Sequence, residues 1–134
     1  MTCNVDVNFL VEKAKSVLGN SYAPYSNIHV ASAVLTKSGR VYLGVNVENS
    51  SYGLTICAER SAISSMVTHG ERELVAVAVV TDMDKPIPPC GACRQVIAEF
   101  NPEATIIMHS VKTKETIVMN LKELYPQPFK LTTT

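Results

Sequence analysis

Apolar residues recur at helical spacing near the start of the chain and then gather in short runs separated by polar turns. Residues three and four positions apart share one helix face, so the apolar positions within 6–19 predict a first helix. Apolar and β-branched runs predict strands over 28–36 and 40–47, and the short link 37–39 makes them a hairpin. The run 74–81 is continuously apolar or β-branched, which is typical of a strand covered on both faces.

Three further helices and two further strands complete the predicted order α-β-β-α-β-α-β-β-α. Good helix formers predict helices over 58–69, 91–100 and 121–125, and the remaining strands fall at 105–109 and 116–119. A strand-helix-strand unit pairs the third and fourth strands in parallel. The last two strands are joined by too few residues for a parallel crossover, so they form an antiparallel hairpin. The prediction is an α/β fold, a three-layer α/β/α sandwich with a mixed five-stranded sheet.

Length and charge narrow the classes of function. The chain has 134 residues, and we expect 1–134 to fold as a single domain. Twelve basic and twelve acidic side chains cancel, which argues against a general nucleic-acid binder or a protein of anionic membrane surfaces. The longest purely apolar run, 74–80, is far shorter than the roughly 20 residues that span a bilayer. The first residues show no basic-then-apolar signal pattern. We therefore expect a cytoplasmic protein with no nucleic-acid or membrane partner.

The four cysteines carry the candidate chemistry. Cysteines of a cytoplasmic chain are more often metal ligands or free thiols than disulfides. Cys57 opens a Cys-x-Glu motif that ends at Glu59, and Cys90 and Cys93 form a Pro-Cys-x-x-Cys motif, whereas Cys3 stands alone. Both motifs fall at predicted helix starts, where free N–H groups favour thiolates. Three sulfur ligands rather than four are typical of a catalytic zinc site that keeps one position open for water.

Each motif alone has other interpretations. A lone Cys-x-x-Cys is equally a redox pair or half of a structural zinc site, and a four-sulfur site would require Cys3. Together, Cys-x-Glu, a gap and Pro-Cys-x-x-Cys form the signature of zinc nucleobase deaminases, including the three-cysteine variant and a glutamate that does not ligate. Glu59 lies too close to Cys57 in the chain to be an obvious fourth ligand. It is placed to touch a water held by the metal.

With these motifs in view, nearly the whole chain resembles the small cytidine deaminases of pyrimidine salvage. The resemblance is carried by 22–26 (YAPYS), 46–49 (NVEN), 57–60 (CAER) and 89–96 (PCGACRQV). It implies zinc-dependent hydrolytic deamination of cytidine and deoxycytidine to uridine and deoxyuridine, with release of ammonia and one Zn²⁺ per chain. Polynucleotide and transfer-RNA deaminases share the zinc core but join their last two strands through a helix. The short link here argues against them.

The resemblance also assigns roles by position. It makes Cys57, Cys90 and Cys93 the zinc ligands and Glu59 the proton shuttle between water and the pyrimidine. Three thiolates on Zn²⁺ leave a net negative charge, and Arg60, three residues beyond the first ligand on the same helix, is placed to offset it. Otherwise Arg60 would be an ordinary solvated helix residue.

The nucleoside itself would be held by other segments. The resemblance implies that Asn46 and Glu48 hold the ribose hydroxyl and that the Ala58 backbone N–H meets the pyrimidine carbonyl. Ile28 stands where the family commonly has an aromatic residue that stacks on the base. An aliphatic side chain can cover a pyrimidine face but loses the stacking geometry.

Phe129 lies beyond the last helix in a segment interrupted by two prolines. An aromatic residue at the matching place in the family closes the active site of a neighbouring subunit. The resemblance therefore implies a homo-oligomer, a tetramer with active sites shared between chains. The alternative is that Phe129 packs on its own core.

The sequence leaves two alternative functions open. One is a deaminase of another aminopyrimidine nucleoside, since the ribose-binding residues do not exclude an analogue. The other is a structural zinc or redox-switch module built on Cys90 and Cys93, which leaves Glu59, Asn46 and Glu48 without a role.

Overall fold

The computed structural model describes residues 5–131, and one five-stranded sheet lies at its centre. The strands are β1 (Val30–Thr36), β2 (Val41–Val45), β3 (Leu74–Thr81), β4 (Thr105–Ser110) and β5 (Thr116–Asn120). Their order in the sheet is β2-β1-β3-β4-β5. β3 and β4 pair in parallel, and the other neighbouring pairs are antiparallel. The predicted mixed sheet is therefore confirmed, including the parallel third and fourth strands and both hairpins.

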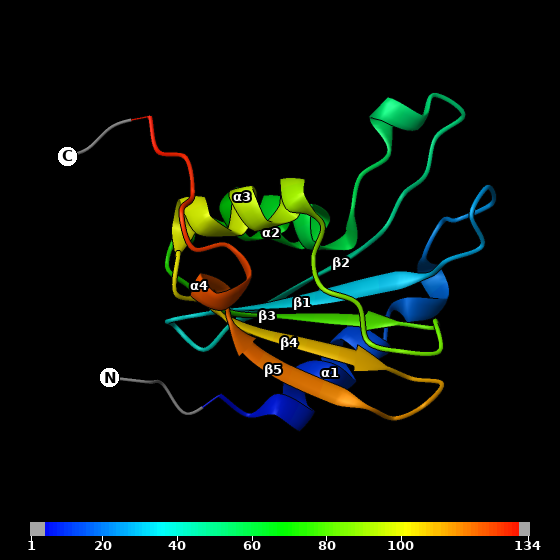
Figure 1. The fold of residues 1–134 in the computed structure, drawn as a ribbon, viewed down its shortest axis with the longest axis horizontal. Helices are drawn as coiled ribbons and strands as arrows, with labels where there is room; N and C mark the ends of the chain where they lie inside the picture. The colour runs from blue at the N-terminus through cyan, green and yellow to red at the C-terminus, as the bar shows by residue number, and fades with distance from the viewer. Residues whose placement is uncertain (1–4, 132–134) are drawn as a thin grey trace.

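Helices cover both faces of the sheet (Figure 1). The helices are α1 (Val7–Lys15), α2 (Ala58–Thr68), α3 (Gly91–Phe100) and α4 (Leu121–Leu124), with 3-10 turns η1 (Leu18–Asn20) and η2 (Tyr52–Leu54). α2 and α3 lie side by side on one face and α1 lies on the other, which confirms the three-layer sandwich. None of the helices within residues 5–131 is both long enough and apolar enough to cross a lipid bilayer.

The predicted first helix over 6–19 is wrong at its C-terminal end. Asp6 caps α1 by accepting a hydrogen bond from the Phe9 backbone N–H, but the α-helix ends at Lys15. Beyond it, the N–H of Val17 donates to the carbonyl of Ala14, three residues back. This bond type tightens the chain into a 3-10 turn, so the apolar spacing continues while the helix type changes.

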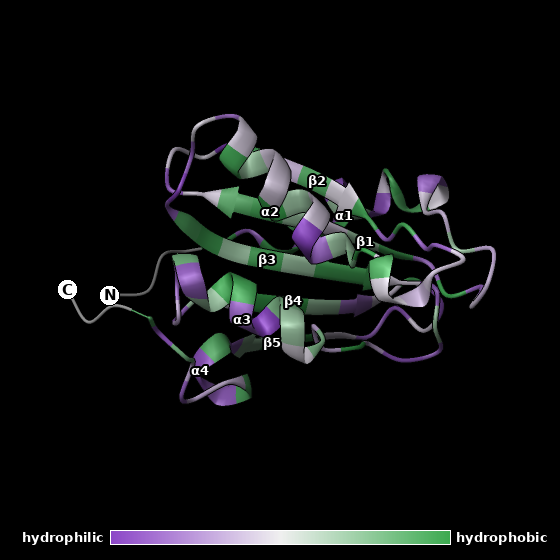
Figure 2. Cartoon of the chain, turned by 90° about the horizontal axis from the view of Figure 1, so that it is seen from above, coloured by the Kyte–Doolittle hydropathy of each residue, from purple (hydrophilic) through white to green (hydrophobic). Residues whose placement is uncertain are grey.

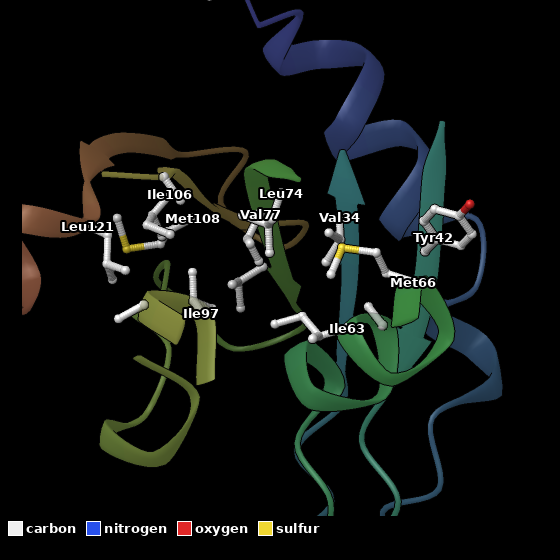
Figure 3. Packing of buried hydrophobic residues seen from close by; sticks show 14 residues of the cluster. Val34, Tyr42, Ile63, Met66, Leu74, Val77, Ile97, Ile106, Met108 and Leu121 are labelled. Atoms are coloured by element: carbon white, nitrogen blue, oxygen red, sulfur yellow. The ribbon is translucent and has the colours of Figure 1, made fainter. Parts of the chain in front are cut away.

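Successive side chains of a strand point to opposite faces of the sheet, so the sheet separates two apolar cores. In β3, Val77 and Val79 face the layer of α2 and α3, whereas Ala76 and Ala78 face α1. Figure 3 shows Ile63, Met66 and Ile97 of the two helices pointing toward Val34, Val77, Ile106 and Met108 of the strands. Figure 2 shows hydrophobic residues along β3 and β4 beneath α2 and α3. A strand buried on both faces needs the continuous apolar run that the sequence carries.

β2 and α2 approach each other at Gly44. A Cβ atom built on this residue would lie 2.4 Å from the Ala62 nitrogen and 2.6 Å from the Ala58 carbonyl oxygen. Only glycine allows two backbones to approach this closely. Gly44 therefore sets the position of the first turn of α2 on the sheet.

We expect Gly44→Ala to lower the free energy of unfolding by about 1–3 kcal/mol, since the added methyl group must push α2 away from β2. Chemical denaturation measures the change. Gly19→Ala is the control, because a Cβ there meets nothing within 4 Å. Equal stability of the two variants would contradict the close packing of α2 on β2.

Candidate active site

Three cysteine sulfurs converge where α2 and α3 begin, at the same end of the sheet (Figure 1). Cys57 is the N-cap residue of α2, Cys90 is the N-cap residue of α3, and Cys93 lies in the first turn of α3. All three are free thiols, and their Sγ atoms lie within 4.8 Å of one another. The sequence motifs, 33 residues apart along the chain, are thus brought together in space.

The three sulfurs suit a zinc ion. Zinc–sulfur bonds of about 2.3 Å in tetrahedral geometry separate two sulfurs by about 3.8 Å. The Sγ atoms of Cys57 and Cys90 are 3.7 Å apart. Soft thiolate donors select zinc over the hard cations that prefer oxygen. Cys3, the fourth cysteine, lies outside the described residues.

Arg60 supplies positive charge beside the sulfurs. Its Nη2 atom lies 3.3 Å from the Cys57 Sγ atom and 3.5 Å from the Thr55 carbonyl oxygen. Its Nε atom is buried and has no hydrogen-bond partner within the part of the chain that the structure describes. A guanidinium held this way requires negative charge nearby, which the thiolates of a metal site provide.

The protonation of the thiols is unequal. Hydrogen bonding from the Cys93 thiol, supported by the Arg60 guanidinium, lowers the pKa of Cys57 to about 5. The same hydrogen bond and burial raise the pKa of Cys93. Without metal, Cys57 is therefore the thiolate and Cys93 keeps its proton.

Glu59 is a buried carboxyl group beside the sulfurs. Only 4% of its surface is exposed, although it lies in the first turn of α2, where a carboxylate is usually solvated. Burial, with a smaller contribution from the negative charge of Cys57, raises the pKa of Glu59 to about 7. A carboxyl group with this pKa can both accept and donate a proton near neutral pH.

A pocket of about 180 Å³ connects these groups. Cys57, Glu59 and Cys90 line it, together with Asn46 and Ala58. Ala58 is the first residue of α2, and the first N–H groups of a helix have no acceptor within the helix. The pocket thus places a proton carrier, a free N–H donor and the sulfurs around one small space.

Glu48 lines a second, adjacent pocket of about 340 Å³, and Thr55 lies in the wall of both pockets. The Glu48 carboxylate accepts hydrogen bonds from the backbone N–H groups of Tyr25 and Ser26 and from the Ser26 hydroxyl. The Ser26 hydroxyl bond is the main reason that the pKa of Glu48 is lowered. Glu48 therefore holds the loop before β1 against the pocket.

Asn46 ties the same loop to the sheet. Its Oδ1 atom accepts from the Val30 backbone N–H and the Ser21 hydroxyl, and its Nδ2 atom donates to the Ile28 carbonyl oxygen. One N–H of the amide is left over, because Nδ2 carries two donors. Asn46 can thus organise the loop and still donate into the pocket.

Two of the five predicted substrate-binding residues line neither of these pockets. The Ile28 side chain is 38% exposed, and the Phe129 side chain is 68% exposed. The alternative in which Phe129 packs on its own core is therefore wrong. Three further residues that the motifs did not indicate, Thr55, Ile87 and Pro88, line the cysteine pocket. Their only signal was position, since each stands two or three residues before a cysteine of the motifs.

Comparison with known proteins agrees with this geometry. Residues 5–109, more than half of the chain, match the family described as "Cytidine and deoxycytidylate deaminase zinc-binding region". The chain belongs to the cytidine and deoxycytidylate deaminase family. This membership confirms the predicted family and its zinc cofactor.

Individual relatives of this family match along most of their length. A cytidine deaminase of Halalkalibacterium halodurans is 42% identical over 93% of this chain and 95% of its own. A cytidine deaminase of Mycobacterium tuberculosis is 38% identical over 96% of this chain and 92% of its own. The crystal structure of cytidine deaminase from Burkholderia pseudomallei superposes with a TM-score of 0.88 at 41% identity, covering 93% of this chain and all of that one. The fold derived from the loop lengths is thus the fold of this deaminase family.

Zinc binding by the three sulfurs is expected to weaken as the pH falls. The metal must displace the proton that Cys93 retains, so affinity falls about tenfold or more for each pH unit between about pH 8 and about pH 6. Competition with a chromophoric chelator measures the affinity, and a pH-stat counts the protons released. Affinity that is independent of pH would contradict the assignment of a protonated Cys93.

Proposed function

We propose that this chain is a zinc-dependent cytidine deaminase, which hydrolyses cytidine and deoxycytidine to uridine and deoxyuridine and releases ammonia. The observation that carries the proposal is the buried Glu59 carboxyl group, which shares one pocket with Cys57 and Cys90. Neither a structural zinc site nor a redox module requires a buried carboxyl group such as Glu59 beside its sulfurs. The match to cytidine deaminases over most of the chain supports the same reaction.

In this proposal Cys57, Cys90 and Cys93 hold one zinc ion per chain. Zinc supplies Lewis acidity, which lowers the pKa of water near it. Arg60 keeps the negative charge of three thiolates from opposing that effect, because its guanidinium contacts the Cys57 sulfur directly. The first turns of α2 and α3 contribute partial positive charge in the same sense.

Glu59 moves the protons of the reaction. It accepts a proton from the attacking water and delivers it to N3 of the cytosine ring, while the water oxygen bonds to C4. The remaining proton of that water oxygen then passes to the amino group, C4=O forms as the C4–N bond breaks, and ammonia leaves. Because burial raises the pKa of Glu59 to about 7, its carboxylate is a stronger base than an exposed glutamate and its acid form is still present near neutral pH.

The nucleoside is oriented by backbone and loop groups. The Ala58 N–H donates to the pyrimidine carbonyl, and Asn46 and Glu48 hold the ribose hydroxyl. Both carboxylate and amide retain bonding capacity beyond their contacts within the chain. Ile28 lines neither pocket, and we propose that its exposed side chain covers a face of the base by dispersion once the nucleoside is bound.

We further propose a homotetramer in which Phe129 closes the pocket of a neighbouring subunit. Exposed apolar side chains over 22–56 support a partner surface beside the pockets. They are Tyr22, Tyr25, Ile28, Val47, Tyr52, Leu54 and Ile56. The Phe129 side chain is exposed and lines neither the cysteine pocket nor the pocket of Glu48, which supports the sharing of sites.

The biological setting follows from the chemistry. Free thiols that serve as metal ligands suit a reducing compartment, so we place the protein in the cytoplasm. A nucleoside substrate places it in pyrimidine salvage, with no nucleic-acid or membrane partner. We regard 1–134 as one domain, since both apolar cores rest on the same sheet.

The test of this function is loss of the cytidine absorption band together with one zinc ion per chain. Glu59→Gln should lower turnover by about 10²–10⁴-fold, because an amide cannot carry a proton. It should leave the zinc content and the fold unchanged. Glu99→Gln, an exposed carboxyl on α3, is the matched control. Loss of zinc from Glu59→Gln would make Glu59 a ligand and overturn its assigned role.

Phe129→Ala should raise the Michaelis constant for cytidine more than it changes thermal stability, because the ring contacts substrate only in the assembly. Leu131→Ala removes another exposed side chain of the same segment and serves as the control. Light scattering at the assay concentration reports the oligomeric state. A fully active monomer would defeat the shared-site proposal.

A further inference from the structure

The segment 84–89 forms one wall of the cysteine pocket. It leads from the end of β3 to Cys90, and its residues Ile87 and Pro88 line the same space as Glu59. Three of its six residues are prolines, which have no N–H to donate. The segment belongs to no helix or strand. It must therefore be held in place by something outside itself.

Arg94 of α3 provides that support. Its Nε atom donates to the Pro89 carbonyl oxygen at 2.8 Å. Among the hydrogen bonds within residues 5–131, this is the only one that reaches the segment 84–89. The bond ends at the residue directly before Cys90, so it fixes both the pocket wall and the approach of the chain to a sulfur.

The same guanidinium is anchored at its other end. Its Nη1 atom donates to the Leu124 carbonyl oxygen, at the end of α4, at 3.1 Å. Arginine presents its donors in a rigid planar fork, whereas lysine carries one compact charge and cannot bridge two carbonyls in fixed geometry. Hydrogen bonds from a charged donor are also stronger than neutral ones.

The anchor on α4 is itself fixed. Leu121 is fully buried, and Asn120 and Glu123 form a capping box at the start of α4. The Gln95 side chain, next to Arg94, accepts from the Tyr125 hydroxyl and donates to the Phe129 carbonyl oxygen at 3.0 Å. Arg94 thus connects the pocket wall to a well-held part of the fold.

We propose that Arg94 is a positioning residue of the active site, which holds the wall 84–89 and the backbone before Cys90 in register with the zinc site. The proposal rests on the proposed function, since it takes Cys90 as a zinc ligand. Without the bridge, the wall would move relative to the sulfurs. Zinc would then leave faster, and cytidine would bind more weakly.

The test uses the zinc-loaded protein with Arg94→Lys. Release of zinc to a chelator should accelerate by about ten- to a hundredfold, because loss of a group that orients a metal ligand usually weakens metal affinity by that factor. The Michaelis constant for cytidine should rise more than the turnover number falls. Arg72→Lys is the matched control, because its Nη1 atom also donates to two backbone carbonyls, those of Val67 and Glu71. The control should match the unmodified protein in both measurements.

The outcomes separate the two proposals. If the unmodified protein binds zinc and deaminates cytidine while Arg94→Lys matches it in zinc release and Michaelis constant, the role of Arg94 is wrong and the proposed function stands. If the unmodified protein binds no zinc, the proposed function fails and the role of Arg94 fails with it.

A measurement on the unmodified protein covers the case in which Arg94→Lys does not fold. The Arg94 Nε–H should exchange slowly with solvent when zinc is bound and faster after chelation, as followed by nuclear magnetic resonance. The Arg72 Nε–H should exchange equally in both states. Equal exchange of the Arg94 Nε–H before and after chelation would overturn the proposal.

Discussion

Two helices that begin side by side at one end of the sheet are the constraint on which the site depends. α2 and α3 each start at a cysteine, and a third sulfur follows one turn into α3. Such an arrangement collects negative charge in a small volume. Two helix N-termini and the Arg60 guanidinium are there to balance it. The geometry in turn requires that α2 lie close on β2, which Gly44 permits, and that α3 start directly beyond the loop from β3.

The same arrangement explains why an acid is buried beside the sulfurs. A carboxyl group in the first turn of a helix is ordinarily stabilised as an anion, yet burial prevails at Glu59 and raises its pKa. Burying a group where its charged form is disfavoured lowers the folding stability of the protein. Active sites commonly contain such groups, because the shifted pKa makes them reactive. Glu48, by contrast, is only partly buried and accepts hydrogen bonds from the loop before β1, so its pKa is lowered. Two glutamates close in sequence thus have opposite proton affinities because their surroundings differ.

Much of the fold could be predicted because loop lengths restrict topology. The short link before β5 allows only a hairpin, and the helix between β3 and β4 requires a parallel pair. The cysteine motifs identified the sulfurs because ligand spacing is a local property of the chain. The end of α1 was missed because apolar spacing does not separate α-helical from 3-10 bonding. The pocket wall of Ile87 and Pro88 could not be predicted, since an irregular segment takes its place from tertiary contacts such as that of Arg94.

The placement of Cys57 on one helix and of Cys90 and Cys93 on another has a consequence for the folding stability of the protein. With zinc held by all three, the metal cross-links α2 to α3 and binds the folded chain in preference to the unfolded one. Each tenfold rise in free zinc then adds about 1.4 kcal/mol to folding stability once the site is near saturation. The zinc-free chain therefore lacks a stabilisation that the zinc-loaded chain has, and the difference grows with the concentration of free zinc. Loss of the metal would lower the folding stability in the same step that removes the Lewis acid of the site.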